Sequence, residues 1–437
     1  MGIELRMKDA SGAILFDTVT DSFTQTRSDQ PLALWESRGE GWLAILDSPL
    51  PAPGVTALKF PLITKLRNIN AHVIHYDILG LVYWCLCRVE EIGRDDLDSH
   101  GRFPAASSHA FKHGYLDRPV VDEWLHILGQ VIQRQWPHTL LRSHQFRMMV
   151  SHDVDRPSRF GFEPWRVIPR IMAGAAIKRG DVNSFFAAPI IKLLTRRKLL
   201  SWDSFNTFDW LMDVSDEYNL RSSFYFICGG SDPLRDADYD LEHPAIRDLL
   251  RRIHERGHEI GLHPSYSTYR DSGALKRESL RLKSVCTQEG IQQYRWGGRM
   301  HYLRVAYPET LIALAEAGLD YDSTLGYADF PGFRCGTCHE YQAFDPKSQK
   351  KIDIKIRPLI VMECSVFSKV YAGLPTEKAM DTMMAMKDRC IAVGGQFTLL
   401  WHNSSFGSEA DHYVYRALLT NTKVTKVNVQ SEGLEHD

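Results

Sequence analysis

The chain has 437 residues, of which 44% are hydrophobic and 24% are charged, and its formal net charge is -2. This is a globular composition, and the length favours two or three domains. The near-neutral balance and the lack of any zinc-finger, basic-zipper or RNA-binding signature give no reason to expect a nucleic-acid partner, and no apolar run approaches the roughly 18 residues that would cross a bilayer.

Residues 1–145 are predicted to form an accessory α+β domain. The first residues alternate apolar and polar side chains as a strand does, and they lack the charged start and apolar core of a signal peptide, so the predicted location is the cytoplasm. Apolar residues recur at helical spacing over 77–92 and 118–136, and prolines bound the second of these helices. No set of residues that could carry catalysis appears in this part.

From residue 146 to residue 437 we predict a second domain in which strands alternate with helices. Strands are expected at 146–154, 221–229, 257–265, 294–300, 319–327, 359–367 and 397–405, and helices at 207–220, 243–257, 273–290, 304–318 and 377–395. Such repeats with buried strands favour an α/β fold with a parallel, barrel-like sheet, and a doubly wound open sheet is the alternative. In either fold the chemistry gathers where the strands end.

A basic insertion interrupts the alternation at residues 159–200. It holds nine Lys or Arg residues against two acids, with Phe, Trp, Ile and Leu between them. Two interpretations stay open. The insertion could contact an anionic membrane surface or a lipid-linked substrate, or it could be a lid with a solvated basic face.

Side chains that could carry chemistry follow several predicted strands. Asp153 and Asp155 end the first strand, and because they are two residues apart they share a face of it. The later strands deliver, in order, His263, then Arg299, His301 and Tyr302, then Asp322, and finally Trp401 and His402. Two nearby carboxylates suit metal binding, or a base beside a ligand. The alternatives are a turn-capping role for the aspartates and core packing for the histidines and the tryptophan.

A cysteine motif stands apart from these strands. Cys335-x-x-Cys338-His339 has the spacing of haem c attachment and would also suit a redox pair or a zinc site. Haem attachment normally requires export, and the chain carries no recognisable export signal. Plain loop cysteines, kept reduced, are therefore the favoured interpretation.

The order of the motifs from about Arg147 to Phe406 resembles the polysaccharide deacetylase (NodB homology) family. The matching stretches are SHDVD, GHEIG followed by His263, RMHY and LLWH. TFDWLMD and YDSTLGYADFPGFRCGT are similar to a bacterial subgroup that has an extra N-terminal domain and is associated with surface-polysaccharide biosynthesis. The resemblance implies a distorted (β/α)7 barrel of deacetylase type. It also implies a hydrolase that removes an N-acetyl group from a sugar or lipid-linked glycan.

The resemblance also implies a role for each residue. The family holds a divalent metal, here expected to be zinc, with one aspartate and two histidines, and it uses a general base and a general acid. Carried over, the base is Asp153, the acid is His402, the residue that orients the base is Arg299, the metal ligands are Asp155 and His263, and the substrate contacts are Tyr302, Asp322 and Trp401. Ser267 stands where the family has its second histidine. The predicted third ligand is His301 from the next strand, and a water or substrate oxygen is the alternative.

Two further functions stay open at this point. Because a serine hydroxyl is a poor zinc ligand, Ser267 also suits a deacetylase-like protein that has lost the reaction and binds a glycan or an assembly partner. The third hypothesis is a hydrolase of another carbon–nitrogen bond, or a glycosidase that uses Asp153 with Asp322. Two carboxylates two residues apart on one strand suit a metal site better than a glycosidase pair.

Overall fold

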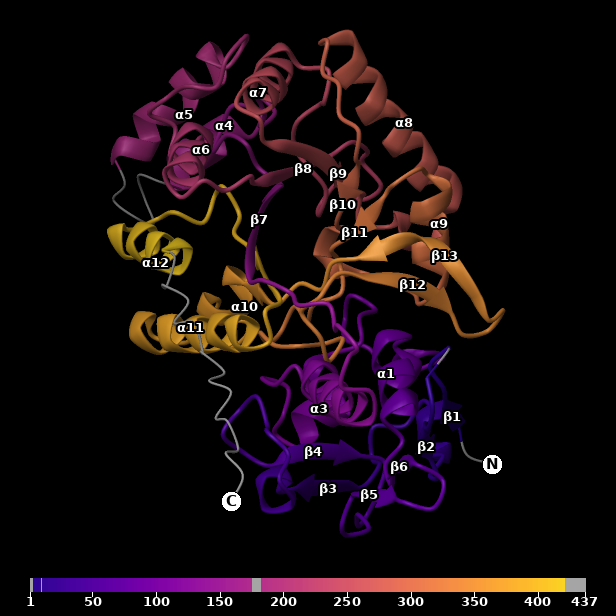
Figure 1. Cartoon of the computed structure of the whole chain (residues 1–437). Helices are drawn as coiled ribbons and strands as arrows, with labels where there is room; N and C mark the ends of the chain where they lie inside the picture. Colours follow the sequence, from indigo (N-terminus) through magenta and orange to yellow (C-terminus); the bar gives the residue numbers. More distant parts are fainter. Residues whose placement is uncertain (1–2, 9, 175–181, 421–437) are drawn as a thin grey trace.

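A computed structural model describes residues 3–8, 10–174 and 182–420 of the chain (Figure 1). Three charged residues of the predicted basic insertion, Lys178, Arg179 and Asp181, lie outside the described residues, as does the end of the second predicted domain after residue 420. Among the residues that are described, no helix is both long and apolar enough to cross a membrane.

The N-terminal part combines a small mixed sheet, a hairpin and three helices. The sheet has the order β1 (Ile3–Leu5), β2 (Ala13–Phe16), β6 (Ala71–Ile74), β5 (Ile63–Leu66), and β3 (Leu32–Trp35) pairs with β4 (Leu50–Pro53). The helices are α1 (Ile78–Leu86), α2 (His109–Lys112) and α3 (Val120–Gln135). Trp35 stacks on Trp124 with ring centres 5.4 Å apart at the centre of an apolar core that is separate from that of the large sheet.

A nine-stranded sheet organises the rest of the chain. Its order is β12 (Tyr341–Asp345), β13 (Lys350–Ile356), β11 (Tyr321–Asp322), β10 (Gly297–Gly298), β9 (Glu259–His263), β8 (Ser223–Ile227), β7 (Arg147–Val154), β15 (Gln396–Leu400), β14 (Val361–Met362). Every neighbouring pair is parallel except β12 with β13. The predicted α/β fold with a large, mostly parallel sheet is therefore confirmed. A hydrogen-bonded closure of this sheet into a barrel is not observed among the described strands.

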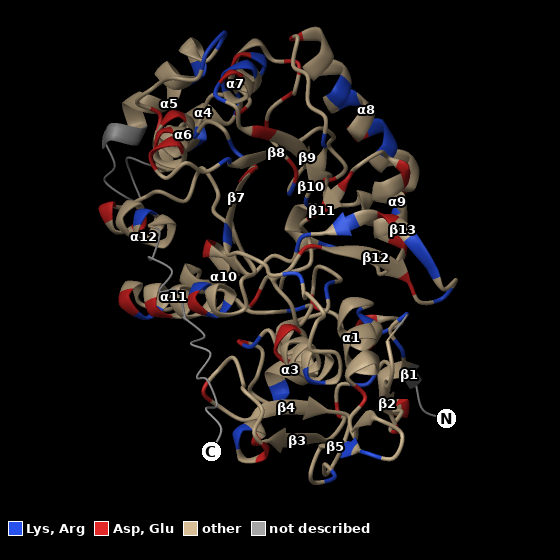
Figure 2. Cartoon of the chain, viewed as in Figure 1, with Lys and Arg blue, Asp and Glu red and all other residues tan. Residues whose placement is uncertain are grey.

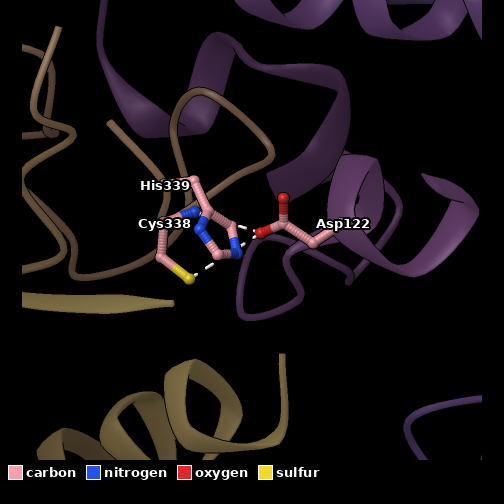
Figure 3. A group of neighbouring side chains, drawn as sticks. All are labelled: Asp122, Cys338 and His339. Carbon is pink, nitrogen blue, oxygen red and sulfur yellow. Dashed lines mark hydrogen bonds between the residues drawn. The ribbon is translucent and has the colours of Figure 1, made fainter. Parts of the chain in front are cut away.

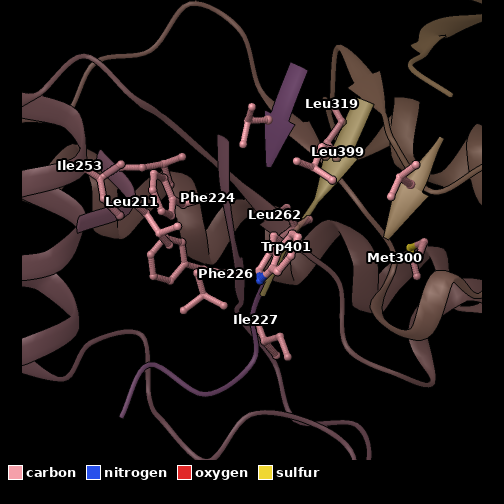
Figure 4. Packing of buried hydrophobic residues seen from close by; sticks show 14 of the residues in the cluster. Leu211, Phe224, Phe226, Ile227, Ile253, Leu262, Met300, Leu319, Leu399 and Trp401 are labelled. Atoms are coloured by element: carbon pink, nitrogen blue, oxygen red, sulfur yellow. The ribbon is translucent and has the colours of Figure 1, made fainter. Parts of the chain in front are cut away.

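Helices surround this sheet in Figure 1. They are α4 (Ile168–Gly174), α5 (Val182–Leu194), α6 (Phe208–Glu217), α7 (Pro244–Glu255), α8 (Ser272–Gln288), α9 (Glu309–Glu316), α10 (Glu363–Phe367), α11 (Thr376–Ala392) and α12 (Glu409–Leu419). The central strand β8 is buried along its whole length, as a strand covered on both faces should be. Figure 4 shows Phe224 and Phe226 of this strand pointing into the apolar core, with Leu211 and Ile253 of the covering helices among the residues around them.

All seven strands and all five helices predicted after residue 146 are present, but β10, β11 and β14 are only two residues long. The prediction missed the β12–β13 hairpin, α10 and α12, as well as the two described helices of the basic insertion. From β7 to β13 the strand order follows the chain without a reversal, which is not the order of a doubly wound sheet. The boundary at residue 145 stays a prediction.

Candidate active site

The ends of the parallel strands surround a cavity of about 660 Å³. The predicted site residues that line it are Asp153, Asp155, His263, His301, Tyr302 and His402. They come from the end of β7, the last residue of β9, the loop after β10 and the loop after β15. Residues that are up to 249 positions apart in sequence thus meet at one edge of the sheet, where a parallel α/β sheet is expected to place its site.

Two histidines converge on Asp155. Its Oδ1 atom lies 3.3 Å from Nε2 of His263 and 3.7 Å from Nε2 of His301. This oxygen is buried and has no hydrogen-bond partner. Nδ1 of His263 donates to the carbonyl oxygen of Arg299 at 2.5 Å, and Nδ1 of His301 lies 3.1 Å from Oδ1 of Asp236. With their Nδ1 atoms engaged elsewhere, both rings turn Nε2 toward Asp155, and the three possible ligand atoms lie within 4.8 Å of one another.

The pairing of β9 with β10 explains why His301 reaches this place. Leu262 and Gly298 are register partners, and the backbone N–H of His301 donates to the carbonyl oxygen of Pro264 at 3.1 Å. His301 therefore lies beside His263 although it belongs to the next strand. Ser267, by contrast, is exposed, does not line the cavity, and donates its backbone N–H to Oγ of Ser231 at 2.8 Å.

Arg299 fixes the orientation of Asp153. Its fully buried guanidinium donates from Nη1 to Oδ1 of Asp153 at 2.8 Å, from Nη2 to Oγ of Ser151 at 2.9 Å, and from Nε to the carbonyl oxygen of Ser323 at 2.9 Å. The planar fork is held on three sides, so it presents one fixed donor to the carboxylate. The other oxygen of Asp153 lies 3.6 Å from Nε2 of His263 and stays at the cavity.

His402 forms a pair with a carboxylate that the sequence did not reveal. Its Nδ1 lies 2.6 Å from Oε1 of Glu363, the first residue of α10, and its Nε2 lies 3.7 Å from Oδ2 of Asp155. Burial opposes the charged ring, but the negative charge of Glu363 outweighs this and holds the pKa of His402 well above its ordinary value. The pair therefore favours the protonated ring, and Nε2 of His402 faces Asp155 at the cavity.

Asp236 is a second carboxylate that no motif indicated. It accepts the backbone N–H of Tyr266 at 2.7 Å and Oγ of Ser231 at 2.9 Å, besides facing His301. Burial would raise the pKa of this carboxyl, but the hydrogen bonds, above all that from His301, lower it to about 2. Burial likewise opposes the charge of His301, but Asp155 and Asp236 raise its pKa to about 9.

The three predicted substrate contacts differ in where they lie. Tyr302 lines the cavity in a left-handed backbone conformation with φ of 59°, and its ring centre is 4.7 Å from that of His301. Asp322 is fully buried, accepts the backbone N–H of Thr324 at 3.0 Å and does not line the cavity. Trp401 is also fully buried and stacks on Phe406 with ring centres 5.5 Å apart. The structure thus brings Tyr302, but not Asp322 or Trp401, to the cavity wall.

The cysteine motif lies away from this cavity, against α3 (Figure 3). Cys335 and Cys338 are fully buried free thiols. Oδ1 of Asp122 accepts Oγ1–H of Thr337 at 2.7 Å, and Oδ2 accepts the backbone N–H of Cys338 at 3.2 Å. Burial raises the pKa of the Asp122 carboxyl to about 7. Asp122, Cys338 and His339 are close enough for their ligand atoms to hold a metal, but the observed hydrogen bonds already explain the group as a tie between the N-terminal part and the 335–339 loop.

Comparison with known proteins gives few matches. A family model described as a family of unknown function (DUF7033) matches residues 19–137. No curated protein matches the chain.

Solved structures that are similar to the chain include the following three. A Mycobacterium smegmatis protein assigned as a polysaccharide deacetylase is 18% identical over 64% of this chain and 85% of its own, with a TM-score of 0.37. The PuuE allantoinase is 12% identical over 63% of this chain and 83% of its own, with a TM-score of 0.36. A Pseudomonas aeruginosa PAO1 protein assigned as a polysaccharide deacetylase is 14% identical over 63% of this chain and 84% of its own, with a TM-score of 0.36. At these TM-scores the likeness supports no functional conclusion for this chain.

Proposed function

We propose that the chain is a metal-dependent hydrolase that removes an N-acetyl group from a sugar used in surface-polysaccharide or lipid-linked glycan biosynthesis. Its large sheet would be a distorted barrel of the deacetylase type, preceded by an accessory domain at residues 1–145. The observation that carries the proposal is the convergence of two histidine Nε2 atoms on one buried, unpartnered carboxylate oxygen of Asp155.

Asp155, His263 and His301 are the residues that would hold the metal. One carboxylate oxygen and two imidazole nitrogens are a common ligand set of catalytic zinc sites, which leave a further position open. The carbonyl of Arg299 and the carboxylate of Asp236 hold the two rings in place, as partners of metal-binding histidines usually do. A zinc ion bound here would supply Lewis-acid chemistry toward an amide carbonyl and a water molecule.

Asp153 is placed to act as the general base. One of its oxygens is held by Arg299, and the other lies at the cavity beside His263. It would take a proton from the water that attacks the amide carbon. Because the guanidinium fixes the carboxylate, the base would not have to be oriented during the reaction.

His402 is placed to act as the general acid. Glu363 holds the ring protonated through Nδ1, so Nε2 can give its proton to the amine nitrogen as the carbon–nitrogen bond breaks. The products are acetate and a free amino sugar, and the proton that Asp153 takes up balances the one that His402 gives. No covalent intermediate with the chain is required.

Two of the alternatives, the protein without the reaction and the glycosidase, have less support. The hypothesis of a protein without the reaction rested on Ser267, but Ser267 lies outside the cavity and His301 supplies a third ligand atom from the next strand. A glycosidase pair of Asp153 and Asp322 would need both carboxylates at the cavity, and Asp322 is buried and hydrogen-bonded to Thr324.

The test is acetate release from a panel of N-acetylated sugars by zinc-loaded protein. Asp153→Asn should lower kcat by a factor of about 10² to 10⁴, the usual contribution of a general base. Asp353→Asn makes the same chemical change at a side chain of β13 that is 95% exposed, and it should leave kcat unchanged. Acetate release by Asp153→Asn at the wild-type rate would refute the mechanism.

A further inference from the structure

One face of helix α5 exposes an apolar stripe. Phe186, Ile190, Leu193 and Leu194 are 60%, 45%, 48% and 52% exposed. Residues spaced by three and four positions lie on the same side of a helix. The opposite side of α5 is anchored, because its residues Ala188 and Ile191 are buried in a small core with Phe160 and Ile168. The exposed stripe is therefore held out from the molecule by a packed helix.

Positive charge surrounds this stripe. Arg196, Arg197 and Lys198 follow the end of α5 directly and are all exposed, and Arg166 and Arg170 are exposed on the segment before it. Over residues 159–174 and 182–200, Glu163 is the single acid in sequence, and it pairs with Arg156 at 2.6 Å. Figure 2 shows α5 and α4 at the outer edge of the molecule, beside α6 and α7.

Two tryptophans flank the same segment. Trp165 is 56% exposed and Trp202 is 54% exposed. Exposed Trp, Phe and Leu side chains with Lys and Arg on one amphipathic surface form the pattern of a helix that lies in the interface of a bilayer. A nucleic acid would match the positive charge but not the apolar stripe, whereas an anionic lipid surface matches both.

The segment is continuous with the cavity wall. Arg156 and Glu163 line the cavity just before the basic insertion enters α4. Two strongly exposed apolar residues, Leu234 and Val370, also line the cavity. Helix α5 is therefore anchored, through Phe160 and Ile168, on a segment that also lines the cavity.

We propose that the exposed stripe of α5 and the basic residues beside it dock the protein on an anionic phospholipid membrane, where the active site takes an N-acetylated sugar carried on a membrane lipid. The docking stands without the reaction, while the choice of a lipid-carried sugar rests on the proposed deacetylase function. Each basic residue near the surface adds attraction to an anionic leaflet. The leucines and Phe186 add apolar burial in the interface.

Vesicle flotation of the full chain tests the docking. The wild type should float with vesicles of phosphatidylcholine and phosphatidylglycerol, release at high salt, and stay unbound with phosphatidylcholine alone. The double variant Leu193→Ser/Leu194→Ser and the double variant Arg196→Glu/Arg197→Glu should each bind at least tenfold more weakly. Both change exposed side chains, and an unchanged thermal midpoint will show that they fold.

Two controls make the same kinds of chemical change elsewhere, a single Leu→Ser substitution and a double charge reversal. Leu43→Ser alters a leucine of the N-terminal part that is 68% exposed, and Lys276→Glu/Arg277→Glu reverses two exposed charges on α8. Both should float as the wild type does. The docking would be overturned if the wild type did not bind anionic vesicles, or if the α5 variants bound them as well as the wild type does. If the chain instead formed a concentration-dependent dimer that the leucine variant lost, the stripe would be assigned to contact with a second copy of the chain.

The second part of the proposal, that the substrate is an N-acetylated sugar carried on a membrane lipid, has its own test. The leucine variant should release acetate from a water-soluble N-acetyl sugar at the wild-type rate but at least tenfold more slowly from the same sugar on a lipid carrier in anionic vesicles. Equal rates of the leucine variant and the wild type on the lipid-carried sugar would overturn the proposal of a lipid-carried substrate. The Asp153→Asn variant should still float, because docking does not need the reaction. If the wild type binds vesicles but releases acetate from none of the N-acetylated sugars, the hydrolase is refuted and the docking stays in place.

Discussion

His301 decides whether the proposed metal site is complete, so His301→Ala is the most informative substitution. In the native chain its Nε2 lies 3.7 Å from Oδ1 of Asp155, beside that of His263. The variant would leave one carboxylate and one imidazole, and catalytic zinc sites normally use three protein ligands. We expect the variant to bind zinc far more weakly at every pH at which the ring of His301 is neutral in the native protein.

The loss of zinc affinity depends on the number of ligands that remain and on the competition between zinc and the proton on His301. Structural zinc sites bind with roughly 10 to 16 kcal/mol, so one ligand of four accounts for about 3 kcal/mol, or on the order of a hundredfold in affinity. At pH 7, however, the proton on His301 must leave before the metal binds, because its pKa is about 9. That proton costs about 2.7 kcal/mol at pH 7 and little at pH 9. The difference between native chain and variant should therefore be small at pH 7 and approach a hundredfold at pH 9.

Competition with a zinc chelator at several pH values measures this directly. The contribution of His301 should make the native affinity rise by close to tenfold per pH unit from pH 7 to 9, and His301→Ala should lose that contribution. His100→Ala is the matched control, because its ring packs on the same Tyr302 at 4.8 Å but does not line the cavity. Ser267→His should not restore binding to His301→Ala, since residue 267 lies outside the cavity. Equal affinities of the native chain and His301→Ala at pH 9 would refute His301 as a ligand.

Three further predictions concern the acid, a buried carboxyl and the sheet. Glu363→Gln removes the charge that raises the pKa of His402, so the alkaline limb of the kcat–pH profile should move to lower pH, and an unmoved limb would contradict the pairing. The carboxyl of Asp122 keeps its proton up to about pH 7 in the folded chain but loses it near pH 4 in the unfolded chain, so Asp122 should lower the free energy of unfolding increasingly between pH 4 and 7, by about 4 kcal/mol at most. The thermal midpoints of Asp122→Asn and wild type should therefore diverge over this pH range. Parallel curves of midpoint against pH would argue against this effect. Gly297→Ala would place a Cβ inside the tyrosine ring of the neighbouring strand and should cost about 1–3 kcal/mol, whereas Gly39→Ala, which has open space, should leave the midpoint of thermal unfolding nearly unchanged.

The regular elements of the large sheet could be predicted because their side-chain patterns are strong. The strand at 221–229 was expected from a run of apolar residues, and β8 occupies Ser223–Ile227 with every residue buried. The β12–β13 hairpin was missed although Lys350–Ile356 alternates exposed and buried residues, a pattern visible in its sequence KKIDIKI. Helix α12 was also missed, and its capping box of Ser408 and Asp411 is a signal that would have found it.

Two carboxylates of the site could not have been found in the same way. Asp236 lies in a loop of turns after β8, and Glu363 follows β14 in a stretch that was expected to continue as a strand. Neither belongs to a motif or has a spacing that suggests chemistry. They reach His301 and His402 only because the fold brings separate loops together, so their roles depend on tertiary contacts that the local sequence does not record.

The replacement at Ser267 shows why a local motif is a poor measure of a metal site. Within one strand–loop segment, a ligand can be exchanged only for another residue of that segment. Adjacent parallel strands offer a second solution, because their ends lie side by side in fixed register, here Leu262 with Gly298. A histidine after β10 can then place its Nε2 beside that of His263, while Arg299, two residues earlier, holds both His263 and Asp153. A serine at position 267, where the resemblance to the deacetylases would put a histidine, is therefore compatible with the proposed ligand set, and the number of ligands has to be counted across the sheet edge.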